Sequence, residues 1–163
     1  MEFLAEFHPP VVHFAIALTI AGVLFDTAGF ILRKESLKHA GFWTFIFGVI
    51  AVWGAVITGH GAEELVEKFV KGTPGEELLE KHEEIGEVLP WVLTVLGLFR
   101  TYIFFKEKAS LFIIYIIAGL IAIGVIGYQG RIGGKMVYEY GIGVKINKLQ
   151  SSYHYEEYEH EED

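Results

Sequence analysis

The sequence predicts an all-α integral membrane protein built as a four-helix bundle, and three observations support this. Four segments of 18 to 24 residues are almost wholly apolar (residues 9–32, 40–59, 88–105 and 109–130). Of the 13 basic and 21 acidic residues in the chain of 163 residues, only Asp26 and Arg100 lie inside these segments. Lys and Arg are concentrated in two short links between them. Since about 20 apolar residues span the hydrocarbon core of a bilayer, we expect four membrane helices.

The composition excludes several other classes of protein. A hydrophobic content of 52% and a net charge of −8 would suit a soluble domain, but the segregation of apolar and charged residues does not. The acidic balance also argues against a nucleic-acid partner. The chain has no cysteine, which excludes disulfides, thiolate-held clusters and c-type haem attachment. The first apolar segment lacks a basic start and a small-residue cleavage site, so we expect it to remain as a membrane helix.

The distribution of basic residues predicts the orientation. The links 33–39 and 106–108 carry five Lys and Arg in ten positions, whereas the other three polar stretches carry seven in 69 positions. By the positive-inside rule the two links face the cytoplasm. Both termini and the loop between the second and third segments then lie on the outer face of the cell inner (cytoplasmic) membrane.

The expected elements follow along the chain. Residues 1–150 form the membrane domain, with helices at about 9–32, 40–59, 75–105 and 109–134. Between the second and third helices we expect a short amphipathic outer helix over residues 62–70, and the sequence Thr73-Pro74-Gly75-Glu76 predicts a capping box that starts the third helix. Residues 134–144 are expected to be rich in turns. The acidic tail, residues 151–163, has the composition of a disordered segment.

The fourth helix is rich in glycine. Gly130 and Gly134 have the small-xxx-small spacing that permits close approach of two membrane helices. Two uses remain open, which are close packing inside the bundle and a homodimer interface formed by this helix.

Four histidines are expected at one level near the outer face: His8, His13, His60 and His82. Imidazole is the commonest metal ligand in proteins, and haem iron is often held by histidines of facing bundle helices. We therefore expect b-type haem at this level, with His13 and His82 as axial ligands and His8 and His60 as alternates. Arg131 would pair with a haem propionate.

Other uses of these residues stay open. The histidines could form a closed site for a Zn, Fe or Cu ion, or could serve only as helix caps and hydrogen-bonding groups. Asp26 and Arg100 lie at similar depths from the cytoplasmic links, roughly 10 Å and 9 Å at 1.5 Å per residue. Because an isolated charge in a membrane is costly, we expect a structural ion pair between them. A proton or ion path is the functional alternative.

The two ends of the apolar region resemble the domain-of-unknown-function 2231 family. The opening His8-Pro9-Pro10-Val11-Val12-His13-Phe14 is similar to the family's His-Pro-x-x-Val-His-Phe. The glycine and tyrosine ending of the family is matched by Gly133, Gly134, Val137, Tyr138, Gly141, Gly143 and Val144. The resemblance covers roughly residues 7–144 and implies a four-helix prokaryotic membrane protein. Some family members are fused to Rieske iron–sulfur or cytochrome c domains, which implies membrane electron transfer. This chain departs from the family in Ala15, where proline is common, and in its long charged outer helix, and we expect no fused redox domain.

These observations together lead to a functional expectation. We expect a haem- or metal-binding membrane protein that exchanges electrons with quinone or with a Rieske or cytochrome c type partner, and so an electron-transfer subunit rather than a hydrolase. A cation- or metal-handling transport component and a structural membrane subunit are the alternatives. The small number of Asn and Gln beside many Glu and Lys hints at a thermophile.

Overall fold

The computed structural model describes residues 2–106 and 108–144, and these ranges fold into four helices. They are α1 (Glu2–Leu32), α2 (Glu35–Val70), α3 (Pro74–Lys106) and α4 (Ala109–Tyr140). Each helix is long and apolar enough to cross a membrane. The predicted all-α membrane fold is therefore confirmed. The expected acidic tail, residues 151–163, lies outside the described residues.

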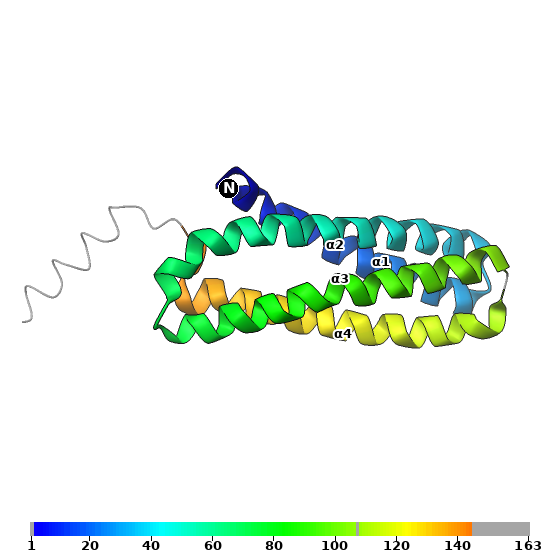
Figure 1. Ribbon diagram of the computed structural model, residues 1–163. Helices are drawn as coiled ribbons and strands as arrows, with labels where there is room; N and C mark the ends of the chain where they lie inside the picture. Colours follow the sequence, from blue (N-terminus) through cyan, green and yellow to red (C-terminus); the bar gives the residue numbers. More distant parts are fainter. Residues whose placement is uncertain (1, 107, 145–163) are drawn as a thin grey trace, which may run out of the picture.

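The helices run up and down as an elongated bundle (Figure 1). Consecutive helices pack against each other, and α1 closes the ring by packing on α4. The link end of the bundle holds residues 33–34, between α1 and α2, together with the end of α3 and the start of α4. The terminal end holds the start of α1, the turn from α2 to α3 and the end of α4. In Figure 1 the first turns of α1 lean away from the other helices at this end.

The helices extend further at the terminal end than the sequence suggested. Residues 62–70 do not form a separate helix but continue α2, since no proline interrupts residues 60–70. With 36 residues, α2 is about 54 Å long and exceeds the ~30 Å hydrocarbon core. The charged parts of α2 and α3, beyond residue 59 and before residue 88, therefore lie outside the apolar segments. Likewise α4 continues to Tyr140 rather than ending near residue 134, and Gly141 ends it with a left-handed φ of 63°.

The capping box expected at the start of α3 is not formed. Glu76 Oε2 accepts a hydrogen bond of 2.7 Å from the backbone N–H of Gly72, whereas the motif requires the N–H of Thr73, which donates to the carbonyl of Val70 at 2.9 Å. The Thr73 hydroxyl instead donates to the carbonyl of Val70 at 2.6 Å. The pair therefore ties the α2–α3 turn to the end of α2 as well as to the start of α3.

The closest helix packing lies between α1 and α2. A Cβ on Gly22 would lie 2.6 Å from the backbone nitrogen of Phe45, and one on Gly48 would lie 2.8 Å from that of Thr19. Only glycine permits such an approach at these two positions. Of the two uses left open for Gly130 and Gly134 of α4, close packing inside the bundle is not found, since a Cβ at either position would meet no atom of the described residues within 4 Å.

The interior consists of two apolar clusters separated by polar residues. The larger cluster fills the link end and the middle of the bundle, and its fully buried members include Phe45 and Leu93. The smaller cluster joins α2, α3 and α4 at the terminal end and contains Val70, Leu79, Ile132, Met136 and Ile142. Between these clusters along the helices lie four polar side chains, His8, Thr58, His82 and Gln129, which we call the histidine layer.

Candidate functional site

Each of the four helices contributes one side chain to the histidine layer. His8 comes from α1, Thr58 from α2, His82 from α3 and Gln129 from α4. Each lies on the side of the larger apolar cluster that faces the terminal end of the bundle. Buried polar groups at such a level need partners, and those without one are candidates for ligand binding.

His8 is oriented by hydrogen bonds to α2. Its Nδ1 lies 3.1 Å from the carbonyl oxygen of Ala55 and 3.2 Å from the hydroxyl oxygen of Thr58. Because the Thr58 hydroxyl itself donates to the carbonyl of Gly54 at 2.9 Å, we assign the proton of His8 to Nδ1, which leaves Nε2 as the basic nitrogen. The ring rests on Gly59, where an added Cβ would lie 3.1 Å from Cε1 of His8.

His82 presents an unsatisfied nitrogen to the same layer. Its Nδ1 is buried and has no hydrogen-bond partner among the described residues. Its ring rests on Gly133, where a Cβ would lie 3.3 Å from Cε1. His82 precedes the apolar segment of α3, and burial lowers the pKa of its imidazole, with the electrostatic effect of the nearby His8 imidazole lowering that pKa further. His82 is therefore neutral near pH 7, the form that binds a metal.

Gln129 connects α4 to this arrangement. Its Nε2 donates a hydrogen bond of 2.6 Å to the backbone carbonyl of His82. Its Oε1 is buried and has no partner among the described residues. Gln129 is not among the site residues predicted from the sequence, although a lone amide beside the glycine-rich surface of a helix is a signal that could have identified it.

The other predicted ligands lie outside the layer. His13 is exposed, and its Nδ1 donates a 2.6 Å hydrogen bond to the carbonyl of Pro9 on the same helix. Five residues separate His13 from His8, which at 100° per residue turns it about 140° around α1. The structure therefore brings His8, and not His13, into the same layer as His82. Arg131 is exposed on α4.

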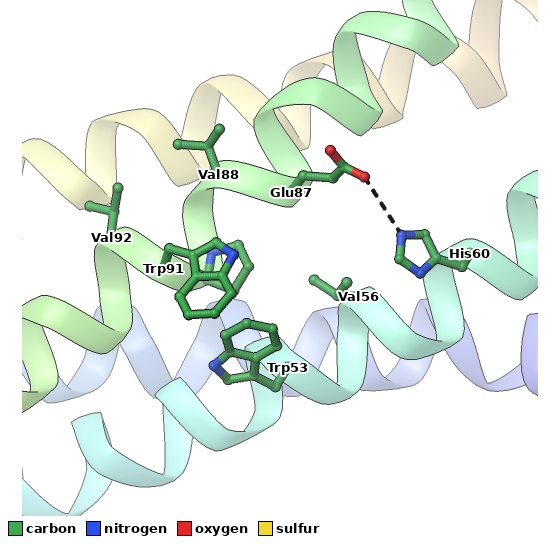
Figure 2. A pocket seen from close by; sticks show the side chains of 8 residues that line it. Trp53, Val56, His60, Glu87, Val88, Trp91 and Val92 are labelled. Atoms are coloured by element: carbon green, nitrogen blue, oxygen red, sulfur yellow. Dashed lines mark ion pairs between the residues drawn. The ribbon is translucent and has the colours of Figure 1, made fainter.

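His60 lies on a separate feature, a groove between α2 and α3 (Figure 2). Its Nε2 is 4.0 Å from Glu87 Oε1, and both side chains are more than half exposed. Below this pair the rings of Trp53 and Trp91 meet at right angles, with their centroids 4.8 Å apart. The groove has a volume of about 540 Å³, within the usual range of small-molecule sites.

A pair of carboxyl groups that the sequence analysis missed also links α2 to α3. Glu63 hydrogen-bonds to Glu83, and burial together with this neighbour raises the pKa of Glu63 to about 7. Both residues lie in the charged parts of their helices, beyond the apolar segments. Two carboxyl groups in contact share a proton, because both cannot ionise at low cost.

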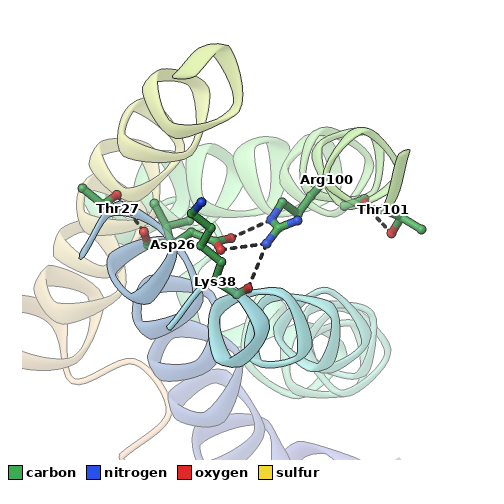
Figure 3. A network of polar contacts seen from close by, with 7 residues as sticks. Asp26, Thr27, Lys38, Arg100 and Thr101 are labelled. Atoms are coloured by element: carbon green, nitrogen blue, oxygen red, sulfur yellow. Dashed lines mark hydrogen bonds and ion pairs between the residues drawn. The ribbon is translucent and has the colours of Figure 1, made fainter. Parts of the chain in front are cut away.

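Near the link end, Asp26 and Arg100 form the ion pair that their matched depths predicted (Figure 3). The guanidinium of Arg100 also donates a 2.9 Å hydrogen bond to the carbonyl of Lys38. Four aromatic rings surround it, with centroids 4.9 to 5.8 Å from its central carbon: Phe42, Phe104, Phe112 and Tyr115. Both charges are fully partnered, which suits a structural role.

Within residues 2–106 and 108–144, no group of three or more His, Asp or Glu side chains is arranged to hold a metal ion. The histidine layer supplies two imidazoles, which is the number that bis-histidine haem iron requires. A closed zinc site requires four ligands.

Residues 5–146 match a family model described as "Predicted membrane protein (DUF2231)". Neither the curated proteins nor the solved structures contain a significant match to the chain.

Proposed function

The chain belongs to the DUF2231 family of predicted membrane proteins, and we propose that it binds a b-type haem in the histidine layer and carries electrons in the membrane. One observation supports this most directly. Among the described residues, Nδ1 of His82 is buried without a partner, and the imidazole of His8, on a different helix, is near enough to affect its pKa. An unsatisfied nitrogen of this kind costs stability unless a ligand binds it.

The surroundings of His8 fit an axial ligand. A ligating histidine usually donates its other ring N–H to a carbonyl, which fixes the ring and raises its basicity. The Nδ1 contact of His8 with the carbonyl of Ala55 has this form. The rings of His8 and His82 pack directly on Gly59 and Gly133, and apolar clusters on both sides of the layer would exclude water from a porphyrin. We therefore propose His8 and His82 as the ligand pair in place of His13 and His82.

A bound haem would supply reversible one-electron transfer. His8 and His82 would set its orientation across the bundle, and Arg131, on the exposed face of α4, would pair with a propionate. The alternative occupant of the two imidazoles is a Zn, Fe or Cu ion, which would indicate a cation-handling transport component. If neither haem nor a metal ion binds, the remaining alternative is a purely structural membrane subunit.

The orientation and partners complete the proposal. The positive-inside rule places the link end in the cytoplasm and the histidine layer near the outer face of the inner membrane. Electrons would then pass between quinone and an outer Rieske or cytochrome c type partner. A homodimer through α4 would use the glycines of that helix that face open space, such as Gly127 and Gly130.

An absorption spectrum of the protein purified in detergent from haem-supplemented cells tests this proposal. We expect a Soret band, and a sharp α band after reduction with dithionite, in the wild type and in the matched control His13→Ala. Both bands should be lost or strongly shifted in His8→Ala and His82→Ala. Absence of a Soret band from the wild type, or identical spectra in all four proteins, would refute haem binding, and elemental analysis of the same samples tests for a Zn, Fe or Cu ion.

A further inference from the structure

We propose that the groove between α2 and α3 binds the ring of a membrane quinone. This inference rests on the proposed redox function and assigns its lipid-soluble partner to a particular set of side chains. The set comprises Trp53, His60, Glu87 and Trp91, which all line the groove (Figure 2).

The groove has one polar end and one apolar end. His60 and Glu87 lie where the apolar segments of α2 and α3 meet the charged parts of these helices. Trp53 lies seven residues further into the apolar segment of α2, about 10 Å along the axis. Val88 and Val92 line the groove and are exposed, so it opens toward the lipid. A quinone has the matching form, with a polar ring near the headgroups and an apolar tail in the bilayer.

The polar end suits the oxygens of a quinone or quinol. Nε2 of His60 and Oε1 of Glu87 are 4.0 Å apart, which is longer than a hydrogen bond and leaves both atoms able to bond a third group. An imidazole N–H can donate to a quinone carbonyl, and a carboxylate can accept from a quinol hydroxyl. Among the described residues that line the groove there is no Lys or Arg, so an anionic headgroup would find no cationic partner and would face the carboxylate.

The aromatic part suits a planar ring. Trp53 is held in place because its Nε1 donates a 3.0 Å hydrogen bond to the hydroxyl of Thr94 on α3. The side chain of Trp91 is 64% exposed, so its ring face is available for stacking. Aromatic rings pair favourably in stacked or edge-to-face geometry. A fixed indole and an accessible one at right angles to it therefore offer both kinds of contact.

The distribution of tryptophan allows a direct test. The chain has three Trp, and Trp43 lies near the start of α2, at the link end. Trp43→Phe therefore leaves only the two groove tryptophans, and the double variant Trp53→Phe/Trp91→Phe leaves only Trp43. Titration of both proteins in detergent with ubiquinone-1 should give saturable quenching of fluorescence in the first and only linear, partition-driven quenching in the second.

Further variants in the Trp43→Phe background test the polar end. His60→Ala should raise the apparent Kd about fivefold, because one hydrogen bond to the quinone is lost. Glu64→Gln, outside the groove, should leave the apparent Kd unchanged. Linear quenching in both tryptophan backgrounds, or an unchanged Kd in His60→Ala, would overturn the proposal. So would saturable quenching by a brominated phosphatidylethanolamine with none by the quinone.

The same titration separates this inference from the proposed haem. It is carried out on protein purified with and without added haemin, and the Soret band is recorded for each sample. Saturable quenching without a Soret band would support the quinone site and refute haem binding. A Soret band with only linear quenching would support haem binding and refute the quinone site. Circular dichroism of each variant shows that the helical fold is retained.

Discussion

Arg100 of α3 donates two hydrogen bonds, each 2.8 Å long, to the two carboxylate oxygens of Asp26 on α1. The two side chains are 2% and 0% exposed. A glycine makes this contact possible, because a Cβ on Gly41 of α2 would lie 2.6 Å from Asp26 Oδ1. The pair therefore joins α1 to α3, two helices that are not neighbours in the ring, across the interior of the bundle.

Removal of one partner from this pair should destabilise the protein strongly. Arg100→Ala leaves the Asp26 carboxylate buried without its cation, and such losses cost about 3–5 kcal/mol. The double variant Asp26→Leu/Arg100→Met removes both charges and should cost less than Arg100→Ala alone. Thermal unfolding in detergent, followed by circular dichroism at 222 nm, shows which of the two variants has the lower melting temperature.

The exposed pair of Lys135 and Glu139, 3.8 Å apart on α4, provides the control. Lys135→Ala should change stability by less than ~1 kcal/mol, because water and salt screen such pairs. If Arg100→Ala melts at or above the temperature of the double variant, Arg100 does not stabilise the fold through Asp26.

Glycines that look alike in the sequence should respond in opposite ways to substitution. Gly22→Ala forces a methyl group to 2.6 Å from the backbone of Phe45, so α1 and α2 must separate. A loss of ~1–3 kcal/mol is expected, as for other overpacked sites. Gly127→Ala adds its methyl group to open space on α4 and should stabilise the helix by up to about 1 kcal/mol.

Thermal melts of the two glycine variants in one detergent give the comparison. If both variants raise the melting temperature, α1 and α2 are not packed as closely as described. If Gly127→Ala is as harmful as Gly22→Ala, the surface of α4 around Gly127 is covered in solution, which would favour the homodimer.

The sequence predicted those features that depend on position along one helix. The length and apolarity of four segments fixed the fold class, and the distances of Asp26 and Arg100 from their links predicted a pair across the bundle. Glycines at intervals of seven, such as Gly22 and Gly29 in α1 or Gly41 and Gly48 in α2, also carried a signal for close packing. The more numerous glycines of α4 were predicted to pack inside the bundle or to form a dimer interface, and the first of these uses is not found for Gly130 and Gly134.

Features that depend on the rotation of one helix against another could not be predicted in the same way. His8 and His13 are both near the start of α1, and only the contact of α1 with α2 decides that His8 faces inward. The contact of Glu63 with Glu83 depends on the register of α2 against α3. That register follows from a continuous α2 that runs to the turn at residues 71–73, whereas the sequence pattern had predicted a separate short helix over residues 62–70.

The shared proton of Glu63 and Glu83 should make the terminal end sensitive to pH. The pKa of Glu63 is raised from 4.5 to about 7, so the folded state retains a proton that the separated helices release. The contribution of this proton to stability is complete below about pH 4.5 and is lost as the pH rises through about 7. Hydrogen exchange over residues 60–85, corrected for the intrinsic rate, should therefore show weaker protection at pH 8 than at pH 6.

Glu63→Gln should remove this difference, because an amide cannot ionise and still bonds to Glu83. Glu64→Gln, at an exposed position beside it on α2, should leave the pH dependence as in the wild type. Equal protection of the wild type at pH 6 and pH 8 would show that the two carboxyl groups do not share a proton.

The absence of cysteine from the chain permits a direct test of the proposed orientation. Ser36→Cys introduces a thiol near the start of α2, at the link end, and Lys71→Cys introduces one in the α2–α3 turn, at the terminal end; both positions are exposed. If Lys and Arg hold the link end in the cytoplasm, a membrane-impermeant maleimide applied to intact spheroplasts should label the cysteine at position 71 and not the one at position 36. Both should react after lysis, which controls for thiol accessibility.

Labelling of position 36 alone in intact spheroplasts would invert the orientation and place the histidine layer and the quinone groove at the cytoplasmic side. Such a result would exclude an outer redox partner while leaving the two sites themselves unchanged.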